Sequence, residues 1–365
     1  MDEAEYDALS RLPGALERHG FASFLAAFPP HATRRDRWAR EADRLDGSLR
    51  SLVDLLLLQR CVSRSALPSE VVAALPVLVA ADVAQLDGTH VSLPRLSLFR
   101  PHGVWLLAEP PGPTQVDTYF GPDSLALAMH ASYGTGRSCL DLCAGPGFQG
   151  LTAAASCATV TLVELMPRAA AIAVLNAALN GAIAKVDVRV GDLYDAVNGE
   201  RYDHVVANVP FMPVPPGHSF PVAGAGGPDG FAIARRVLGG LPEHLEPGGS
   251  AFLATMLLRD EDGDLLLRDE LAAWAAQAGY DVTVLATSAI PATPASPLVR
   301  GTAEAMASGR ADLIEQFTGE ITDHYATLGA RTATWAFLRV GEGDRGLSIV
   351  DLGSTGRLAP WVSMV

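Results

Sequence analysis

A glycine-rich turn between an apolar run and a helical pattern is the feature of this sequence with the clearest chemical potential. The apolar run 139–143 leads into 144–150, where Gly145, Gly147 and Gly150 give G-x-G-x-x-G. Glycines let the backbone turn sharply, admit a ligand close to the main chain and allow a helix to pack closely on a strand. The motif alone is weak evidence, and its weight comes from the residues that follow it.

Polar side chains stand at the ends of the next three apolar runs. Glu164, Asp192 and Asn208 each come at or just after such a run. In an open parallel sheet, ligands bind beyond the carboxyl ends of the strands, near the switch in strand order. We therefore expect these three side chains to meet Asp141 and the glycine turn on one rim.

Each carboxylate has a functional and a structural interpretation. Glu164 lies 19 residues after Gly145, where it can accept both hydroxyls of a ribose or cap the helix that follows it. Asp192 can accept an exocyclic adenine amine or bind its own turn backbone. Asp141 can face an ammonium group or only order the glycine loop.

Composition bounds the class of protein. With 365 residues, 49% apolar and 19% charged, the chain is expected to be globular, with about two domains. The net charge is −14 and no basic run is visible, which disfavours nucleic acid as a partner. Four cysteines without paired metal spacing predict no metal site. Neither a signal peptide nor a membrane-spanning run is seen, so we expect a cytoplasmic protein.

From about residue 137, strands alternate with helices, which is typical of a parallel sheet. Expected strands are 137–143, 160–163, 186–190, 204–207, 250–255, 281–286 and 332–340; expected helices are 148–156, 167–179, 229–244 and 265–277. An insertion at 290–330 carries a helical stretch at 303–325. The pattern predicts an α/β fold with a doubly wound, seven-stranded, mostly parallel sheet.

Residues 1–113 are predicted to form a separate helical domain. Helical spacing covers 9–28, 34–60 and 69–75, and Pro76 is expected to end or kink the last helix. Short strands at 89–93 and 104–108 around a loop suggest a winged-helix-like module. The acidic balance favours a lid or substrate-docking role over DNA binding. A Pro-rich linker at 109–113 then leaves 114–365 as the second domain.

Together these motifs resemble class I S-adenosylmethionine-dependent methyltransferases. The resemblance rests on Asp141 to Gly147, Val163-Glu164, Gly191-Asp192 and Asn208-Val209-Pro210-Phe211. It is closest to the branch with an N-P-P-[YF] signature, which includes glutamine-N5 and nucleobase-amine methyltransferases. The segment 119–124 is similar to the one that this family places before the first strand, against the methionine end of the cofactor. The likeness covers about 115–290 and the strand near 335.

The resemblance implies a class I methyltransferase fold and a role for each matching residue. Residues implied to bind the cofactor are Phe120, Asp123, Asp141, Ala144, Gly145, Gly147, Glu164, Leu165, Asp192, Leu193 and Asn208. Residues implied at the reacting centre are Asn208, Pro210, Phe211 and Tyr119. In this family the Asn side chain and the carbonyl after it hold a planar N–H₂ group while the aromatic ring packs on its face. The implied function is methylation of a nitrogen on a small molecule or peptide.

One position departs from the family pattern. Val209 stands where the family has the first proline. Because proline restricts the residue before it, Asn208 is free to sit differently here. The segment 212–216 adds a rigid apolar wall, which makes a smaller or more apolar acceptor plausible.

Three other functions remain open. In a cyclase, the amine or α-carbon of the cofactor's own amino-acid arm attacks its γ-carbon, expels methylthioadenosine and gives an azetidine or cyclopropane amino acid. Tyr119, Phe120 and Phe211 would then shield the sulfonium. An NAD-dependent oxidoreductase is supported only by the glycine motif and is disfavoured by 208–211. The third is a non-catalytic cofactor-binding or docking module.

Overall fold

The computed structural model describes residues 2–28, 35–110 and 117–352. The expected boundary between 113 and 114, and residues 111–113 of the expected linker, lie outside the described residues. Within the described ranges, no helix combines the length and the apolar character needed to span a bilayer.

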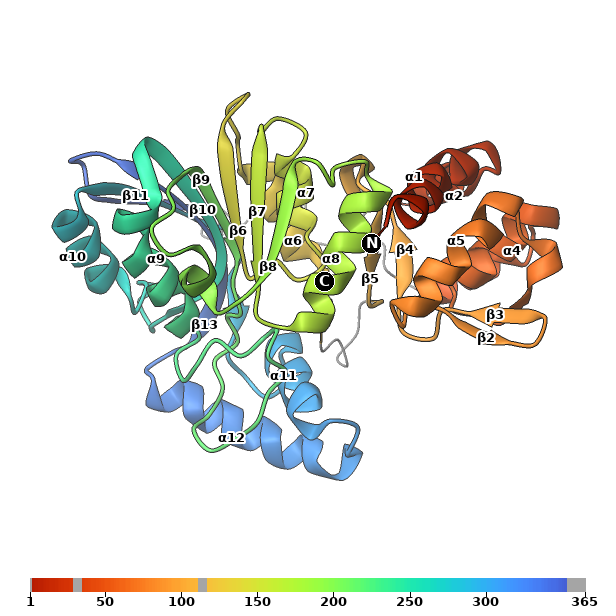
Figure 1. Ribbon diagram of the computed structural model, residues 1–365. Helices are drawn as coiled ribbons and strands as arrows, with labels where there is room; N and C mark the ends of the chain where they lie inside the picture. Colours follow the sequence, from red (N-terminus) through yellow and green to blue (C-terminus); the bar gives the residue numbers. More distant parts are fainter. Residues whose placement is uncertain (1, 29–34, 111–116, 353–365) are drawn as a thin grey trace.

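A mostly parallel sheet lies at the centre of the molecule (Figure 1). Its nine strands are β6 (Ser138–Leu142), β7 (Thr159–Glu164), β8 (Val186–Val190), β9 (Tyr202–Asn208), β10 (Leu245–Arg259), β11 (Tyr280–Ala286), β12 (Ile290–Pro291), β13 (Thr332–Glu342) and β14 (Leu347–Asp351). Their order is β14-β11-β13-β10-β9-β6-β7-β8, with β12 paired to β13. Strand β13 runs antiparallel to its three neighbours β10, β11 and β12, and the other pairs are parallel.

The predicted α/β fold class is confirmed, and all seven predicted strands are present. Strand β6 is flanked by β7 on one side and β9 on the other, so the strand order reverses at β6. That reversal opens a crevice beyond the carboxyl end of β6, where the glycine turn lies. Strands β12 and β14 were not predicted, because β12 has two residues and β14 is a half-buried edge strand.

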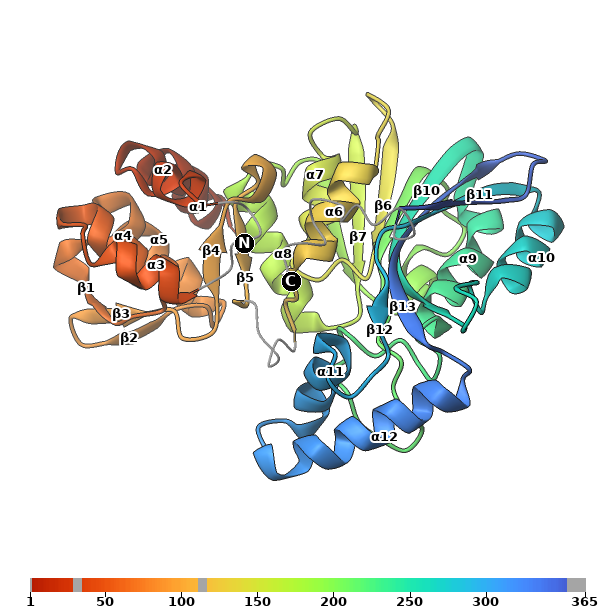
Figure 2. The same cartoon turned by 180° about the vertical axis from the view of Figure 1, so that it is seen from behind.

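Helices pack on both faces of the sheet, and two more lie together beyond one end of it (Figures 1 and 2). They are α6 (Pro122–His130), α7 (Phe148–Ala153), α8 (Pro167–Leu179), α9 (Ala232–His244), α10 (Arg268–Ala278), α11 (Pro297–Ala307) and α12 (Ile314–Thr327). The single helical stretch expected at 303–325 is wrong. Left-handed backbone at Ser308 and Gly309, with φ of 48° and 86°, separates α11 from α12.

The N-terminal elements lie beside α8 (Figure 2). They are α1 (Glu3–Arg18), α2 (Phe21–Ala26), α3 (Arg35–Ala42), α4 (Gly47–Leu56), α5 (Ser69–Ala80), β1 (Val62–Ser63), β2 (Gln85–Asp87), β3 (His90–Ser92), β4 (Ser97–Phe99) and β5 (Leu106–Ala108). Helix α5 continues through Pro76, because the burial of Val77 and Leu78 compensates for one lost hydrogen bond.

The expected hairpin of 89–93 with 104–108 is also wrong. Strand β3 pairs with β1 and β2, whereas β5 pairs with β4. The short strand β4 lies between the two expected strands in sequence and takes β5 as its partner.

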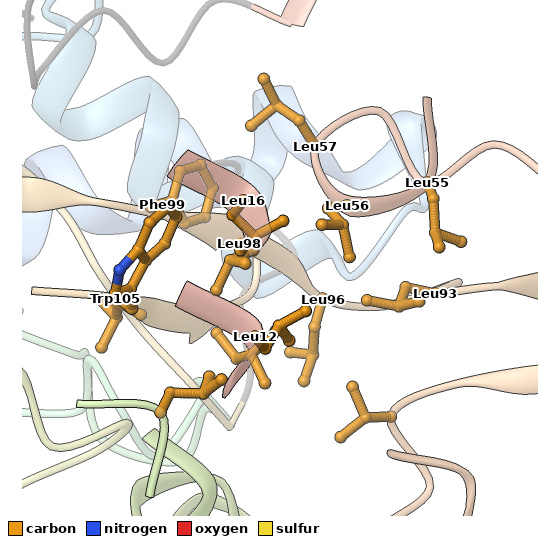
Figure 3. Close-up of a cluster of buried hydrophobic side chains, with 14 of the residues drawn as sticks. Leu12, Leu16, Leu55, Leu56, Leu57, Leu93, Leu96, Leu98, Phe99 and Trp105 are labelled. Carbon is orange, nitrogen blue, oxygen red and sulfur yellow. The ribbon is translucent and has the colours of Figure 1, made fainter. Parts of the chain in front are cut away.

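The largest buried cluster joins the N-terminal elements to the sheet domain. Its centre contains Leu12, Leu16, Leu98, Phe99 and Trp105, drawn in Figure 3. The same cluster continues into Phe120, Phe148 and the α8 residues Ile172, Leu175, Ala178 and Leu179. Burial of apolar surface contributes about 25 cal/mol per Å². This continuous core therefore fixes the N-terminal part against α8.

Candidate functional site

Two adjoining cavities lie at the carboxyl end of the sheet. The first has a volume of about 220 Å³ and is lined by the glycine turn, the ends of β7 and β9, the segment after β8 and the loop 220–225. The second has a volume of about 200 Å³ and is lined by residues after β9, the same loop, and single residues of α11 and β13. Tyr119, Asn208, Phe220 and Ala223 line both.

The glycines of the turn have separate functions. A Cβ added at Gly147 would lie 2.8 Å from Leu162 Cδ2, and one at Gly150 would lie 2.6 Å from Leu162 Cδ1. These two glycines therefore allow α7 to pack on β7, and neither lines a cavity. Gly145 has φ of 55°, lines the first cavity, and a Cβ there would meet nothing nearer than 3.8 Å. Its backbone can therefore approach a ligand closely.

Glu164 makes the contact at the helix start that was predicted for it, and its role toward a ribose stays a prediction. Its carboxylate accepts the Gly145 N–H and the Met166 N–H, both at 2.7 Å, so it shapes the turn and satisfies a donor at the start of α8. It also lines the first cavity. Burial raises the pKa of this carboxyl. Because each carboxylate oxygen can accept two hydrogen bonds, both retain capacity for a ligand hydroxyl.

The wall near β8 contains Asp192 and Leu193, which the resemblance implies in cofactor binding. Asp192 Oδ2 accepts a hydrogen bond from Arg236 at 2.9 Å, and both side chains are partly exposed. Leu193 is buried beside it with φ of 53°. On the same cavity, Leu165 is 49% exposed, which is unusual for a leucine. These residues offer an apolar surface bordered by one carboxylate.

Asp141 lies beneath the turn rather than on a cavity wall. It is fully buried, and its Oδ2 accepts the Gly150 N–H at 2.7 Å. Its Oδ1 has no hydrogen-bond partner within the described part of the chain. Burial, reinforced by repulsion from Glu164, raises the pKa of Asp141 to about 8. The structure thus displays the loop-ordering contact, and a contact with an ammonium group stays a prediction.

Asn208 lies where the two cavities meet. Its Nδ2 donates to Asp123 Oδ2 at 2.7 Å and to Ser124 Oγ at 3.1 Å. The Tyr119 hydroxyl donates to the other oxygen of Asp123 at 2.5 Å. Burial raises the pKa of Asp123. The amide is therefore held by its nitrogen, while its buried Oδ1 has no partner among the residues that the structure describes.

Pro210, Phe211 and Phe120, all predicted at the site, lie in three different places in the structure. Pro210 lines the first cavity, and Phe211 lines the second, where its ring meets Trp335 edge to face with centroids 4.9 Å apart. Phe120 lines neither. It packs between Phe99 and Phe148, with centroids 6.1 and 5.1 Å away, so it belongs to the core shared with the N-terminal part.

Several lining residues were missed from the sequence: Ser124, Gln149, Phe220, Val222, Ala305 and Trp335. The available signal for Phe220 and Val222 was the long loop between β9 and α9, because long loops are usually functional. Ala305 comes from the insertion at 290–330, which thus contributes to the second cavity. No described residue from 2 to 110 lines either cavity.

Comparisons with known proteins match the part of the chain whose described residues line the first cavity. Residues 116–256 match the family model described as Methyltransferase small domain. A ribosomal protein uL3 glutamine methyltransferase from Bradyrhizobium diazoefficiens is 31% identical over 144 residues, covering 37% of this chain and 45% of that protein. A release factor glutamine methyltransferase from Bordetella pertussis is 35% identical over 125 residues, covering 31% of this chain and 46% of that protein. Among solved structures, Trm5 of Methanocaldococcus jannaschii with adenosine is 12% identical, with a TM-score of 0.41 over 68% of this chain and 56% of that chain.

The chain spans less than half the length of these two curated relatives. For residues 116–256, the family match confirms the expected methyltransferase domain of the S-adenosylmethionine-dependent type. The roles of single residues and the altered Asn208-Val209-Pro210-Phe211 signature stay predictions.

Proposed function

We propose that this protein transfers a methyl group from S-adenosylmethionine to an N–H nitrogen of a peptide or small molecule. Three findings support the proposal. Residues 116–256 match a methyltransferase family model. Relatives of that region are named glutamine methyltransferases. The two cavities meet at a side chain suited to hold an N–H group.

The first cavity suits the cofactor. The ribose hydroxyls would bind Glu164, the adenine would lie against Leu165 and Leu193 with its amine near Asp192, and the amino-acid arm would follow the turn at Gly145. This donor set fits the group, because carboxylates face hydroxyls and an amine, and apolar side chains of the cavity wall face a flat ring. When bound, the cofactor supplies a methyl carbon made electrophilic by the sulfonium.

The unpartnered Oδ1 of Asn208 is the observation that carries the proposal. A buried acceptor without a partner costs about 1–3 kcal/mol, which a ligand N–H would recover. Since Nδ2 is already held by Asp123 and Ser124, the amide can only accept at its free end. It would thereby hold an acceptor nitrogen at the boundary between the cavities.

The reaction needs little further from the protein. The nitrogen lone pair would form the new N–C bond as the S–C bond breaks, and the electron pair of the broken S–C bond would stay on the sulfur of S-adenosylhomocysteine. The nitrogen then loses a proton, and Asp123 is the carboxylate of the second cavity that can take it. Holding both reactants in line contributes roughly 7–11 kcal/mol to such reactions.

The test combines binding and turnover. We expect S-adenosylhomocysteine, and not NADH, to bind in isothermal titration calorimetry. Asn208→Ala should lower kcat by about 100-fold, the loss typical of one positioned polar group, and change the S-adenosylhomocysteine affinity far less. Asn198→Ala serves as the control, because its exposed side chain donates only to the Asp195 carbonyl.

Two results would contradict the proposal. Full turnover by Asn208→Ala would remove that residue from the reaction. Release of methylthioadenosine from S-adenosylmethionine alone, seen by mass spectrometry, would establish the cyclase instead. The second cavity gives a separate acceptor room beside the first, and Phe120 lies away from both, so the arrangement favours transfer over cyclisation.

A further inference from the structure

The second cavity has its polar groups on one side. Tyr119, Asp123 and Asn208 are joined to one another by hydrogen bonds, so they form a single polar patch. The remaining lining side chains are aliphatic or aromatic and include Phe211 and Trp335. A ligand that fits this cavity therefore needs one polar end and an apolar body.

The size of the cavity limits that body. Its volume is about 200 Å³. In another protein, a cavity of about 150 Å³ lined by aliphatic and aromatic side chains stays dry and binds benzene. The space here thus suits one six-membered ring with a short polar substituent, and is small for several residues of a peptide.

The walls also suit a flat group. The rings of Phe211 and Trp335 meet at an interplanar angle of 78°, so they form two adjacent sides of a corner. Aromatic pairs prefer such edge-to-face or offset arrangements, and a third ring can join them in the same way. Met212 and Phe220 complete the apolar side, and the thioether of Met212 adapts to the outline of a ring.

We propose, on the basis of the proposed function, that the acceptor is an uncharged small molecule whose N–H₂ group belongs to a carboxamide on a single aromatic ring. Its N–H bonds to Asn208 Oδ1, and its ring fills the corner of Phe211 and Trp335. This substrate class differs from the protein glutamine side chain named for the relatives.

Ala305 of α11 gives a direct way to test the fit. It is a half-buried residue of the second cavity, and its small side chain leaves space that a leucine would fill. Because it does not line the first cavity, Ala305→Leu should retain the affinity for S-adenosylhomocysteine. Ala272→Leu on α10 is the matched control, since Ala272 is also half-buried on a helix and lines neither cavity.

The experiment uses three probes with the same carboxamide end: benzamide, acetamide and a glutamine-containing tripeptide. Binding to the full chain saturated with S-adenosylhomocysteine is measured by ligand-observed NMR, and methyl transfer is measured with labelled S-adenosylmethionine. We expect benzamide to bind most tightly. Ala305→Leu should lower the benzamide-to-acetamide preference by about tenfold, whereas Ala272→Leu should leave it unchanged.

The outcomes separate this inference from the proposed function. If S-adenosylhomocysteine binds but benzamide does not, or if the tripeptide binds or reacts better than benzamide, the aromatic acceptor is wrong and the methyltransferase proposal stands. An unchanged preference in Ala305→Leu would likewise overturn it. If S-adenosylhomocysteine itself fails to bind, the proposed function falls first.

Discussion

The orientation of Asn208 depends on one buried carboxylate. Asp123 is only 3% exposed and accepts from both Asn208 and Tyr119. Because two donors point at the Asp123 carboxyl, its ionised form is the one that holds the Asn208 nitrogen. The Oδ1 of the amide is then left for a ligand. Asp123 is therefore inferred to position Asn208, in addition to accepting the proton in the proposed reaction.

Asp123→Asn tests this function. An asparagine there has one acceptor oxygen for two donors, so either Asn208 or Tyr119 loses its partner. Loss of a hydrogen bond to a charged group costs about 1.5–3 kcal/mol, so kcat should fall roughly 10- to 100-fold. The affinity for S-adenosylhomocysteine should change little, because Asp123 lines only the second cavity. Asp195→Asn, at an exposed position, is the control.

The pH profile gives a signature that a merely structural residue would not produce. Burial raises the pKa of Asp123 above its ordinary value. Wild-type kcat should therefore fall as the pH is lowered through this raised pKa, because the protonated carboxyl can no longer accept both donors or a proton. Asp123→Asn should lose this acid limb. A limb that persists in the variant would show that another group titrates.

At the scale of elements, the sequence pattern predicted those helices and strands that local interactions determine. The bounds of α8 and β8 agree with the sequence prediction, because Pro167 marks the start of an apolar helical run and β8 alternates valine with charged residues. Glu164, Asp192 and Asn208 could be placed on one rim because parallel strands end at one edge. Trp335 and Ala305 could not, since they enter the second cavity through contacts between segments far apart in the chain. Phe120 was misplaced for the same reason: its partners include Phe99 of β4.

The packing of α7 on β7 yields an element-scale prediction. Gly147 has φ of 88°, and an added Cβ would also lie 3.3 Å from Ala173 Cβ. Gly136 has φ of 74° but no atom within 4 Å of such a Cβ. Gly136→Ala should thus lower the free energy of unfolding by about 1–2 kcal/mol for the left-handed backbone. Gly147→Ala should lower the free energy of unfolding by about 1–3 kcal/mol more than Gly136→Ala, because its added Cβ overpacks the contact.

Urea unfolding of both glycine variants measures this difference, and titration with S-adenosylhomocysteine reports the state of the turn. Only Gly147→Ala should weaken ligand binding, because its backbone leads directly from the cavity-lining residues 143–146. Equal unfolding free energies for the two variants would rule out the close helix–strand contact as the reason for glycine at 147.

At the scale of the whole molecule, the N-terminal part is tied to the glycine turn through helix α8. Asn176 Oδ1 accepts the Leu107 N–H at 2.8 Å, and its Nδ2 donates to the carbonyls of Leu107 and Pro146 at 3.1 and 2.8 Å. One helical turn later, Asn180 Oδ1 accepts the Trp105 N–H at 2.9 Å and its Nδ2 donates to the Trp105 carbonyl at 2.7 Å. Two asparagines thus substitute for a neighbouring strand along β5.

Of these two asparagines, only Asn176 contacts the glycine turn. Variants of the two can therefore distinguish packing of the N-terminal part on α8 from an effect on ligand binding. Both Asn176→Ala and Asn180→Ala leave backbone groups of the β5 segment without partners, and each should lower the free energy of unfolding by about 2–4 kcal/mol. Asn176→Ala also releases the carbonyl of Pro146, which lines the first cavity, so it alone should weaken S-adenosylhomocysteine binding, by roughly tenfold. Denaturant unfolding and calorimetry on the two variants measure both effects. Equal affinities would mean that the N-terminal part stabilises the chain without shaping the glycine turn.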